Sequence, residues 1–140
     1  SPRQRLTGDA ANGDIATTNY ARDYEGTITG ETTVDGEACY TLDLKARARN
    51  VTYDRIRYWI SKKRRLGLKA EFLTVSGELF KSATFTYGNV LKTPEGTFEF
   101  VSRMHIRDET GAKSETVMTF AQPRAETHAT SLFNINNVVR

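Results

Sequence analysis

Hydrophobic and polar residues alternate along most of this chain with a period of two, which is typical of β-strands that bury one face. Residues 53–61 show the pattern well, because Ile56, Tyr58 and Ile60 alternate with Arg55, Arg57 and Trp59. Similar runs occupy residues 38–46, 66–75, 82–87, 97–108 and 114–122. With a further strand from Tyr24, the spacing predicts about seven strands.

Turn-forming residues separate these runs. They include Asp35-Gly36, Ser76-Gly77, Pro94-Glu95-Gly96 and Thr110-Gly111, all of which favour tight reversals. Strands that follow one another through such short turns pair as hairpins, so we expect an antiparallel meander. Two stretches favour a short helix: residues 13–24, with Asp14 as the N-cap, and residues 131–139, with Ser131 in that role.

The alternation places a set of large apolar side chains on one face of the predicted sheet: Leu42, Leu44, Ile56, Tyr58, Ile60, Leu68, Phe72, Phe85, Phe98, Phe100, Met104, Ile106, Met118 and Phe120. With so little helix, this face must be covered in one of three ways. The sheet closes into a barrel, a second layer covers it, or it curves around a hydrophobic ligand. Phenylalanine, methionine and aliphatic side chains suit an acyl chain, which needs only dispersion contacts, yet an ordinary barrel core fits the pattern equally well.

The four cations Lys62, Lys63, Arg64 and Arg65 fall in the gap between two predicted strands. A hairpin tip is solvated, so we interpret the run as a turn. The chain has 140 residues and a formal net charge of +3, which is weak for nucleic-acid binding. Acidic residues also share the polar sheet face, and we expect no nucleic-acid partner.

No catalytic or metal-binding constellation is evident in the sequence. Cys39 is the only cysteine, and neither His105 nor His128 lies at metal-ligand spacing from another histidine or from Cys39. The carboxylates Asp43, Asp54, Glu71, Glu99, Asp108 and Glu115 are scattered along the chain. Glycine-rich phosphate loops and nucleophile motifs are missing, so we expect neither enzymatic activity nor a cofactor.

The chain length suits one domain, which we expect to span residues 1–140 with an irregular segment at 1–13. No apolar run reaches the ~18 residues that a membrane-spanning helix needs, so we expect no membrane span. A signal peptide is not present, and the first residue is not methionine. We therefore expect the sequence to be a part of a longer protein, without the N-terminal part of the domain.

Three segments resemble one protein family. They are Y-x-x-D-Y-x-G-x-I-x-G-E-x-x-V-D-G-E-x-C-Y-x-L-D-L over residues 20–44, Y-D-R-I-R-Y-W-I-S-K with L-K-A-E-F and S-G-E-L-F-K over residues 53–81, and L-F-N-I-N-N-V-V-R over residues 132–140. Together they resemble the outer-membrane lipoprotein-sorting proteins of the LolA/LolB-like superfamily. The resemblance covers most of the chain from about Tyr20 onward.

The resemblance implies a mainly β half-barrel, in which a strongly curved, unclosed antiparallel sheet is capped by helices on its concave face. It also implies a periplasmic carrier of Gram-negative bacteria, with phospholipid or lipoprotein acyl chains as ligands and an inner-membrane lipid transporter as a candidate partner. The family is longer at its N-terminus, and its gating arginine has no counterpart at any position here. The alternative is a non-enzymatic interaction domain that docks a membrane transporter without binding lipid.

Overall fold

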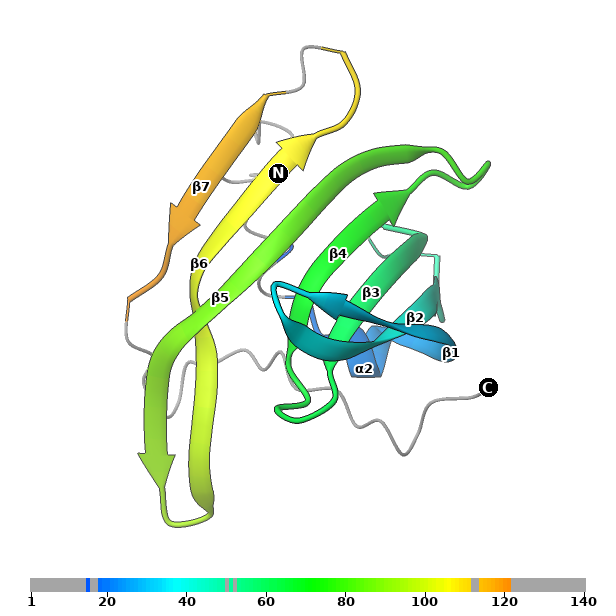
Figure 1. Cartoon of the computed structure of the whole chain (residues 1–140). Coiled ribbons are helices and arrows are strands. Elements are labelled where there is room, and N and C mark those ends of the chain that lie inside the picture. Colours follow the sequence, from blue (N-terminus) through cyan, green and yellow to red (C-terminus); the bar gives the residue numbers. More distant parts are fainter. Residues whose placement is uncertain (1–14, 16–17, 50, 52, 112–113, 122–140) are drawn as a thin grey trace.

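Seven strands and one short helix make up the computed structural model, which describes residues 15, 18–49, 51, 53–111 and 114–121. The helix α2 spans Tyr20–Asp23, and the strands are β1 (Tyr24–Val34), β2 (Glu37–Ala46), β3 (Arg55–Ser61), β4 (Gly67–Leu73), β5 (Leu79–Thr93), β6 (Gly96–Asp108) and β7 (Glu115–Thr119). Each strand pairs antiparallel with the next, in the order β1 to β7 (Figure 1). The predicted seven-stranded meander is confirmed.

The turns lie where the sequence predicts them. Asp35 and Gly36, which join β1 to β2, have φ angles of 49° and 81°. Both angles are positive, as a two-residue hairpin requires when its twist is to match that of the strands. The turns at Ser76-Gly77, Pro94-Glu95 and Thr110-Gly111 likewise fall between consecutive strands.

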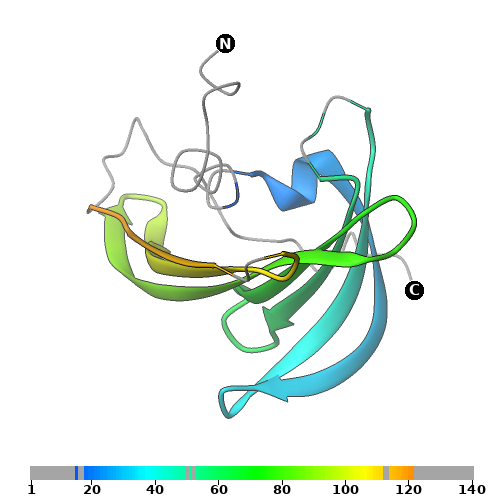
Figure 2. The ribbon, with the colours of Figure 1, turned by 90° about the horizontal axis from the view of Figure 1, so that it is seen from above.

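The sheet curves strongly and stays open, because within the described residues β1 and β7 pair only with their sequence neighbours. Register shifts interrupt β1–β2, β3–β4, β4–β5 and β5–β6. Such bulges bend a strand and increase its twist. Figure 2 shows α2 on the inner side of the curve. The predicted half-barrel fold is therefore confirmed, and we call the side that α2 covers the concave face.

The helix predicted at residues 13–24 lies partly outside the described residues, and within them α2 spans Tyr20–Asp23. Asn19 is the N-cap of α2, and its side-chain oxygen accepts a hydrogen bond from the Arg22 backbone nitrogen at 3.0 Å. The predicted cap Asp14, the irregular segment 1–13 and the second predicted helix at 131–139 lie outside the described residues.

The basic run occupies the turn between β3 and β4, as predicted, but half of it is paired with acids. Lys62 forms an ion pair with Glu31, and Arg64 binds both carboxylate oxygens of Glu37 at 2.9 Å. Both acids come from the β1–β2 hairpin. The run therefore ties the β3–β4 turn to the β1–β2 hairpin, and its charge is partly neutralised.

The convex face is polar and cross-linked by charges. Arg57 pairs with Glu71 at 2.7 Å, and the Lys69 ammonium lies 4.9 Å from the ring centroid of Trp59. The polar-face position that alternation predicts for Trp59 is thereby confirmed. The apolar core lies on the opposite, concave side of the sheet.

Candidate functional site

The concave face gathers most of the apolar side chains that alternation predicts. One cluster contains, fully or nearly fully buried, Leu42, Leu44, Ile56, Tyr58, Ile60, Phe72, Phe85, Met104 and Ile106. Met118 and Phe120 pack against this cluster and are partly buried. We call this set, with the further members named below, the concave cluster.

Leu68, Phe98 and Phe100, which alternation places on the same face, are not among the members of the concave cluster. The prediction assumed uninterrupted alternation along each strand, and register shifts interrupt it in β4 and β6. Leu68 lies at the shift where Trp59 pairs with Lys69 but Ile60 pairs with Gly67.

Two register shifts in the β5–β6 hairpin, one between Thr86 and Tyr87 and one between Tyr87 and Asn89, separate its outer part from the cluster. Thr86 pairs with Arg103 but Tyr87 pairs with Val101, which leaves Ser102 as an extra residue in β6. Beyond an extra residue, the side chains of a strand point to the face opposite the one that uninterrupted alternation predicts. Val101 therefore joins the concave cluster in place of Phe100, although Phe100 is itself buried.

Tyrosines form a large part of the concave cluster, and most of them were missed in the sequence. Tyr20, Tyr24 and Tyr53 are buried, and Tyr87 packs against the cluster. Their hydroxyls donate to backbone carbonyls: Tyr20 to Ile15 at 2.7 Å, Tyr24 to Tyr53 at 2.5 Å and Tyr87 to Gly67 at 2.6 Å. Burial raises the pKa of Tyr20, Tyr24 and Tyr58, so these phenols stay neutral. Two of them gave a signal in the sequence: Tyr20 lies with Ile15 on the apolar side of the predicted first helix, and Tyr87 alternates with Ala83 and Phe85.

A low point lies at the centre of the concave face. Ala70 of β4 and Ala83 of β5 are direct cross-strand partners, and both are buried. In the same row, Tyr58 pairs with Ala70 and Ile106 pairs with Ala83. Two methyl groups between two large side chains make the floor lower here than on either side.

The described cover over this floor is aromatic and small. The ring of Tyr20, from α2, stacks on Tyr58 with centroids 4.7 Å apart and planes inclined by 23°. Ile15 is fully buried in the same cluster. Tyr53, which precedes β3, packs on Phe72 at a centroid distance of 4.5 Å. Among the described residues, the cover over the β3–β4 floor thus consists of side chains from Ile15, α2 and the loop before β3.

Gly67 makes room for Tyr58 at the edge of this floor. A Cβ atom on Gly67 would lie 1.8 Å from the Tyr58 hydroxyl oxygen and 2.1 Å from the ring carbon that bears it. Real Cβ atoms do not approach other atoms so closely. The Tyr58 ring therefore occupies the position that any other residue at 67 would need.

A half-buried lysine lies at the end of the concave face. Lys81 pairs with Phe72 of β4 and with Asp108 of β6, and its ammonium is 6.0 Å from the Tyr53 ring centroid. Burial lowers the pKa of Lys81, and Asp108 partly offsets this effect. The apolar floor thus ends beside a cation.

No catalytic geometry connects the residues considered from the sequence. Cys39 is buried on β2 and His105 lies on β6, with three strands between them. The Cys39 pKa is raised by burial, which disfavours the reactive thiolate. Asp43 and Glu71 each pair with an arginine, and Glu115 pairs with His105, rather than with another carboxylate. In the part of the chain that the structure describes, no group of His, Cys, Asp and Glu side chains has metal-site geometry.

No helix among the described residues has the length and apolar character to cross a membrane. The convex face, in contrast to the concave floor, carries a polar hollow of about 250 Å³ lined by Thr84, Thr86, Arg103, His105 and Val117.

Known proteins share this architecture. A family model whose description reads "uncharacterized protein" matches residues 1–140. A LolA superfamily protein from Nitrosomonas europaea is 30% identical with a TM-score of 0.66, over 88% of this chain and 57% of that one. An outer-membrane lipoprotein-sorting protein domain from Vibrio parahaemolyticus, described as putative, is 22% identical with a TM-score of 0.57, over 69% of this chain and 40% of that one.

A third similar structure is a DUF1329 family protein from Desulfovibrio piger, which is 23% identical with a TM-score of 0.59, over 76% of this chain and 42% of that one. This chain therefore spans about half the length of the solved structures that it matches. No curated protein matches the sequence.

Proposed function

We propose that this chain, which is 30% identical to a LolA superfamily protein over 88% of its length, is a periplasmic carrier that holds the acyl chains of a lipid or lipoprotein on its concave face. Its role would be the sorting of lipid or lipoprotein to the outer membrane. The observation that carries this proposal is the concave cluster itself, which runs across β2 to β7 of a sheet that does not close.

The chemistry of the concave face supports an acyl ligand. An acyl chain gains dispersion contacts and loses contact with water, at about 25 cal/mol per Å² of buried apolar surface. The hydroxyls of Tyr20, Tyr24 and Tyr87 already donate to backbone carbonyls. A chain that lies against these three rings therefore leaves their hydroxyls with partners, and a hydroxyl without one would cost about 1–3 kcal/mol.

Entry of the ligand requires the aromatic cover to move. Tyr20 lies on a four-residue helix and stacks on Tyr58. An aromatic pair of this kind contributes about 0.5–1.5 kcal/mol beyond its buried area. An acyl chain on the Ala70–Ala83 floor replaces that stack with its own contacts to Tyr58, so α2 acts as a small lid.

Lys81 supports an anionic head group at one end of the ligand. It lies at the end of the apolar floor, and its ammonium is half-buried beside Tyr53. A carboxylate or phosphate there would stabilise the charged form of the lysine.

The direct test is organic extraction of the purified protein followed by mass spectrometry. We expect co-purifying phospholipid, fatty acid or lipoprotein, and saturable binding of a fluorescent fatty acid after the lipid is removed. Ala70→Phe fills the low point of the floor and should lower lipid retained per folded molecule. Thr41→Phe is the matched control, because it adds a similar volume to the neighbouring row on the convex face and should retain lipid.

Two results would count against the carrier. One is an extract without lipid combined with no binding of the fluorescent fatty acid. The other is equal lipid retention by Ala70→Phe and Thr41→Phe. Either result would favour the alternative, a non-enzymatic domain that docks a membrane transporter through the curved sheet.

A further inference from the structure

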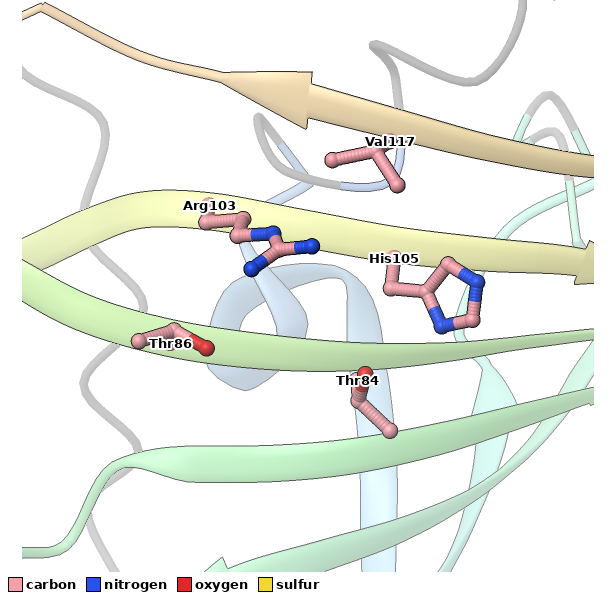
Figure 3. A pocket seen from close by; sticks show the side chains of 5 residues that line it. All are labelled: Thr84, Thr86, Arg103, His105 and Val117. Atoms are coloured by element: carbon pink, nitrogen blue, oxygen red, sulfur yellow. The ribbon is translucent and has the colours of Figure 1, made fainter.

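The polar hollow on the convex face has a defined architecture. Thr84 of β5, His105 of β6 and Val117 of β7 are successive cross-strand partners, and Thr86 pairs with Arg103 in the next row. In Figure 3, α2 lies behind the strands, so these side chains are on the face opposite the concave cluster. The hollow has a volume of about 250 Å³. Three adjacent strands therefore hold its walls in place.

Arg103 differs from its neighbours on this face. Arg55 pairs with Asp43, Arg57 with Glu71, and Arg107 lies 4.0 Å from Glu109. Among the described residues, no carboxylate pairs with Arg103. Figure 3 shows its guanidinium directed into the space between Thr86 and His105.

The residues that line the hollow include a permanent cation and no acid. His105 Nε2 lies 2.7 Å from the Glu115 carboxylate, which comes from β7 and does not itself line the hollow. Lys69 is the cross-strand partner of Thr84, and its ammonium stands over Trp59. Lys69 therefore points toward β3, and Arg103 supplies the positive charge of the hollow.

These features point to an oxyanion. A guanidinium offers five donors in a planar fork, and two threonine hydroxyls add donors in another direction. Donors in more than one plane suit a tetrahedral group better than a planar carboxylate. The volume is below the roughly 300–1,000 Å³ of pockets for drug-sized ligands, and four of the five lining residues are polar, which excludes an acyl chain.

We propose that the hollow formed by Thr84, Thr86, Arg103 and His105 is a binding site for a phosphoryl group, supplied either by free phosphate or by a phospholipid head group at a membrane surface. Arg103 binds two phosphoryl oxygens through its fork, and the threonine hydroxyls donate to a third. The site is independent of the lipid carrier function, because it lies on the opposite face of the sheet.

The first experiment titrates inorganic phosphate into the purified chain while the backbone amide signals of the hollow are followed by NMR. We expect saturable shifts at Thr84, Thr86 and Arg103. Arg103→Gln should weaken binding by about tenfold or more, since it removes a charge-assisted contact. Arg107→Gln is the matched control, because it removes an arginine from the same strand and face, and it should bind phosphate as the unaltered chain does.

A second experiment separates the two sources of the phosphoryl group. Co-sedimentation with vesicles of phosphatidylglycerol, at fixed ionic strength, should be reduced by Arg103→Gln and by added phosphate if the head group is the ligand. If Arg103→Gln changes phosphate binding but not co-sedimentation, free phosphate is the ligand. The proposal is overturned if phosphate causes no saturable shift in the unaltered chain, or if both arginine variants weaken its binding equally.

Discussion

Replacing Gly67 with alanine should destabilise the protein, although the same change at most strand glycines is neutral or favourable. The backbone of Gly67 is not in the left-handed region, so its conformation suits alanine. Without a clash, Gly→Ala would stabilise by about 0.4–1 kcal/mol, because alanine loses less chain entropy on folding. The clash with Tyr58 reverses this sign.

The magnitude follows from the contacts of Tyr58. The new Cβ would lie 1.8, 2.1 and 2.8 Å from three atoms of that side chain. Tyr58 is 1% exposed and is held by Tyr20, so its ring has little space to move. Overpacking costs about 1–3 kcal/mol, and loss of the Tyr20 stack adds about 0.5–1.5 kcal/mol. We expect Gly67→Ala to lower the free energy of unfolding by about 2–4 kcal/mol.

A double-mutant cycle in urea melts tests this cause directly. In a Tyr58→Ala background the clash is absent, so Gly67→Ala should raise the free energy of unfolding by about 0.4–1 kcal/mol. Gly30→Ala is the control, because no atom lies within 4 Å of its added Cβ. The reasoning is refuted if Gly67→Ala costs as much with Tyr58 absent as with Tyr58 present, or if it is as harmless as Gly30→Ala.

Three further predictions concern the convex side and the β3–β4 turn. Trp59 fluorescence should be quenched by acrylamide and should not shift to the blue when lipid is added, because the ring lies under Lys69 on the convex face; a lipid-dependent blue shift would contradict this. Arg64→Ser should lower stability by about 1 kcal/mol through loss of the Glu37 contacts, whereas Lys63→Ser should stay within about 0.5 kcal/mol of the unaltered chain; equal effects in urea melts would be inconsistent with the pairing. Hydrogen bonds from Arg64 and Ser61 hold the pKa of Glu37 below its ordinary value. The contribution of Glu37 to folding stability is therefore complete above about pH 4.3 and is lost as the pH falls through its folded-state pKa. Between neutral pH and about pH 3, the Tm of Arg64→Ser should fall less than that of the unaltered chain, and a parallel fall would show that Glu37 is not the group responsible.

Local chemistry in the sequence was enough to predict the strands and their order. Alternation at Ile56, Tyr58 and Ile60 indicates a half-buried strand whatever its neighbours are, because successive side chains of a strand point to opposite faces. The pair Asp35-Gly36 suits positive φ angles in any hairpin. Strand order then follows, since short turns permit only pairing between consecutive strands.

The composition of the candidate site depended on tertiary structure, because residues far apart in the sequence decide it. Alternation alone predicts that Phe98 and Phe100 lie on the face of Met104. The pairing with β5 shows that Ser102 is an extra residue in β6, and Val101 packs in the cluster with Met104 instead. Nothing in the sequence around Tyr20 indicates that its ring stacks on Tyr58.

The charges of the β3–β4 turn show the same division. The sequence placed Lys62 to Arg65 in a turn, because four adjacent cations favour water over a packed core. Only the fold brings Glu31 and Glu37 of the β1–β2 hairpin against Lys62 and Arg64. Whether a residue favours a strand, a turn or exposure to water depends on its own chemistry and on its immediate neighbours in the sequence. Its contacts depend on strand register and sheet curvature, which long-range pairing sets.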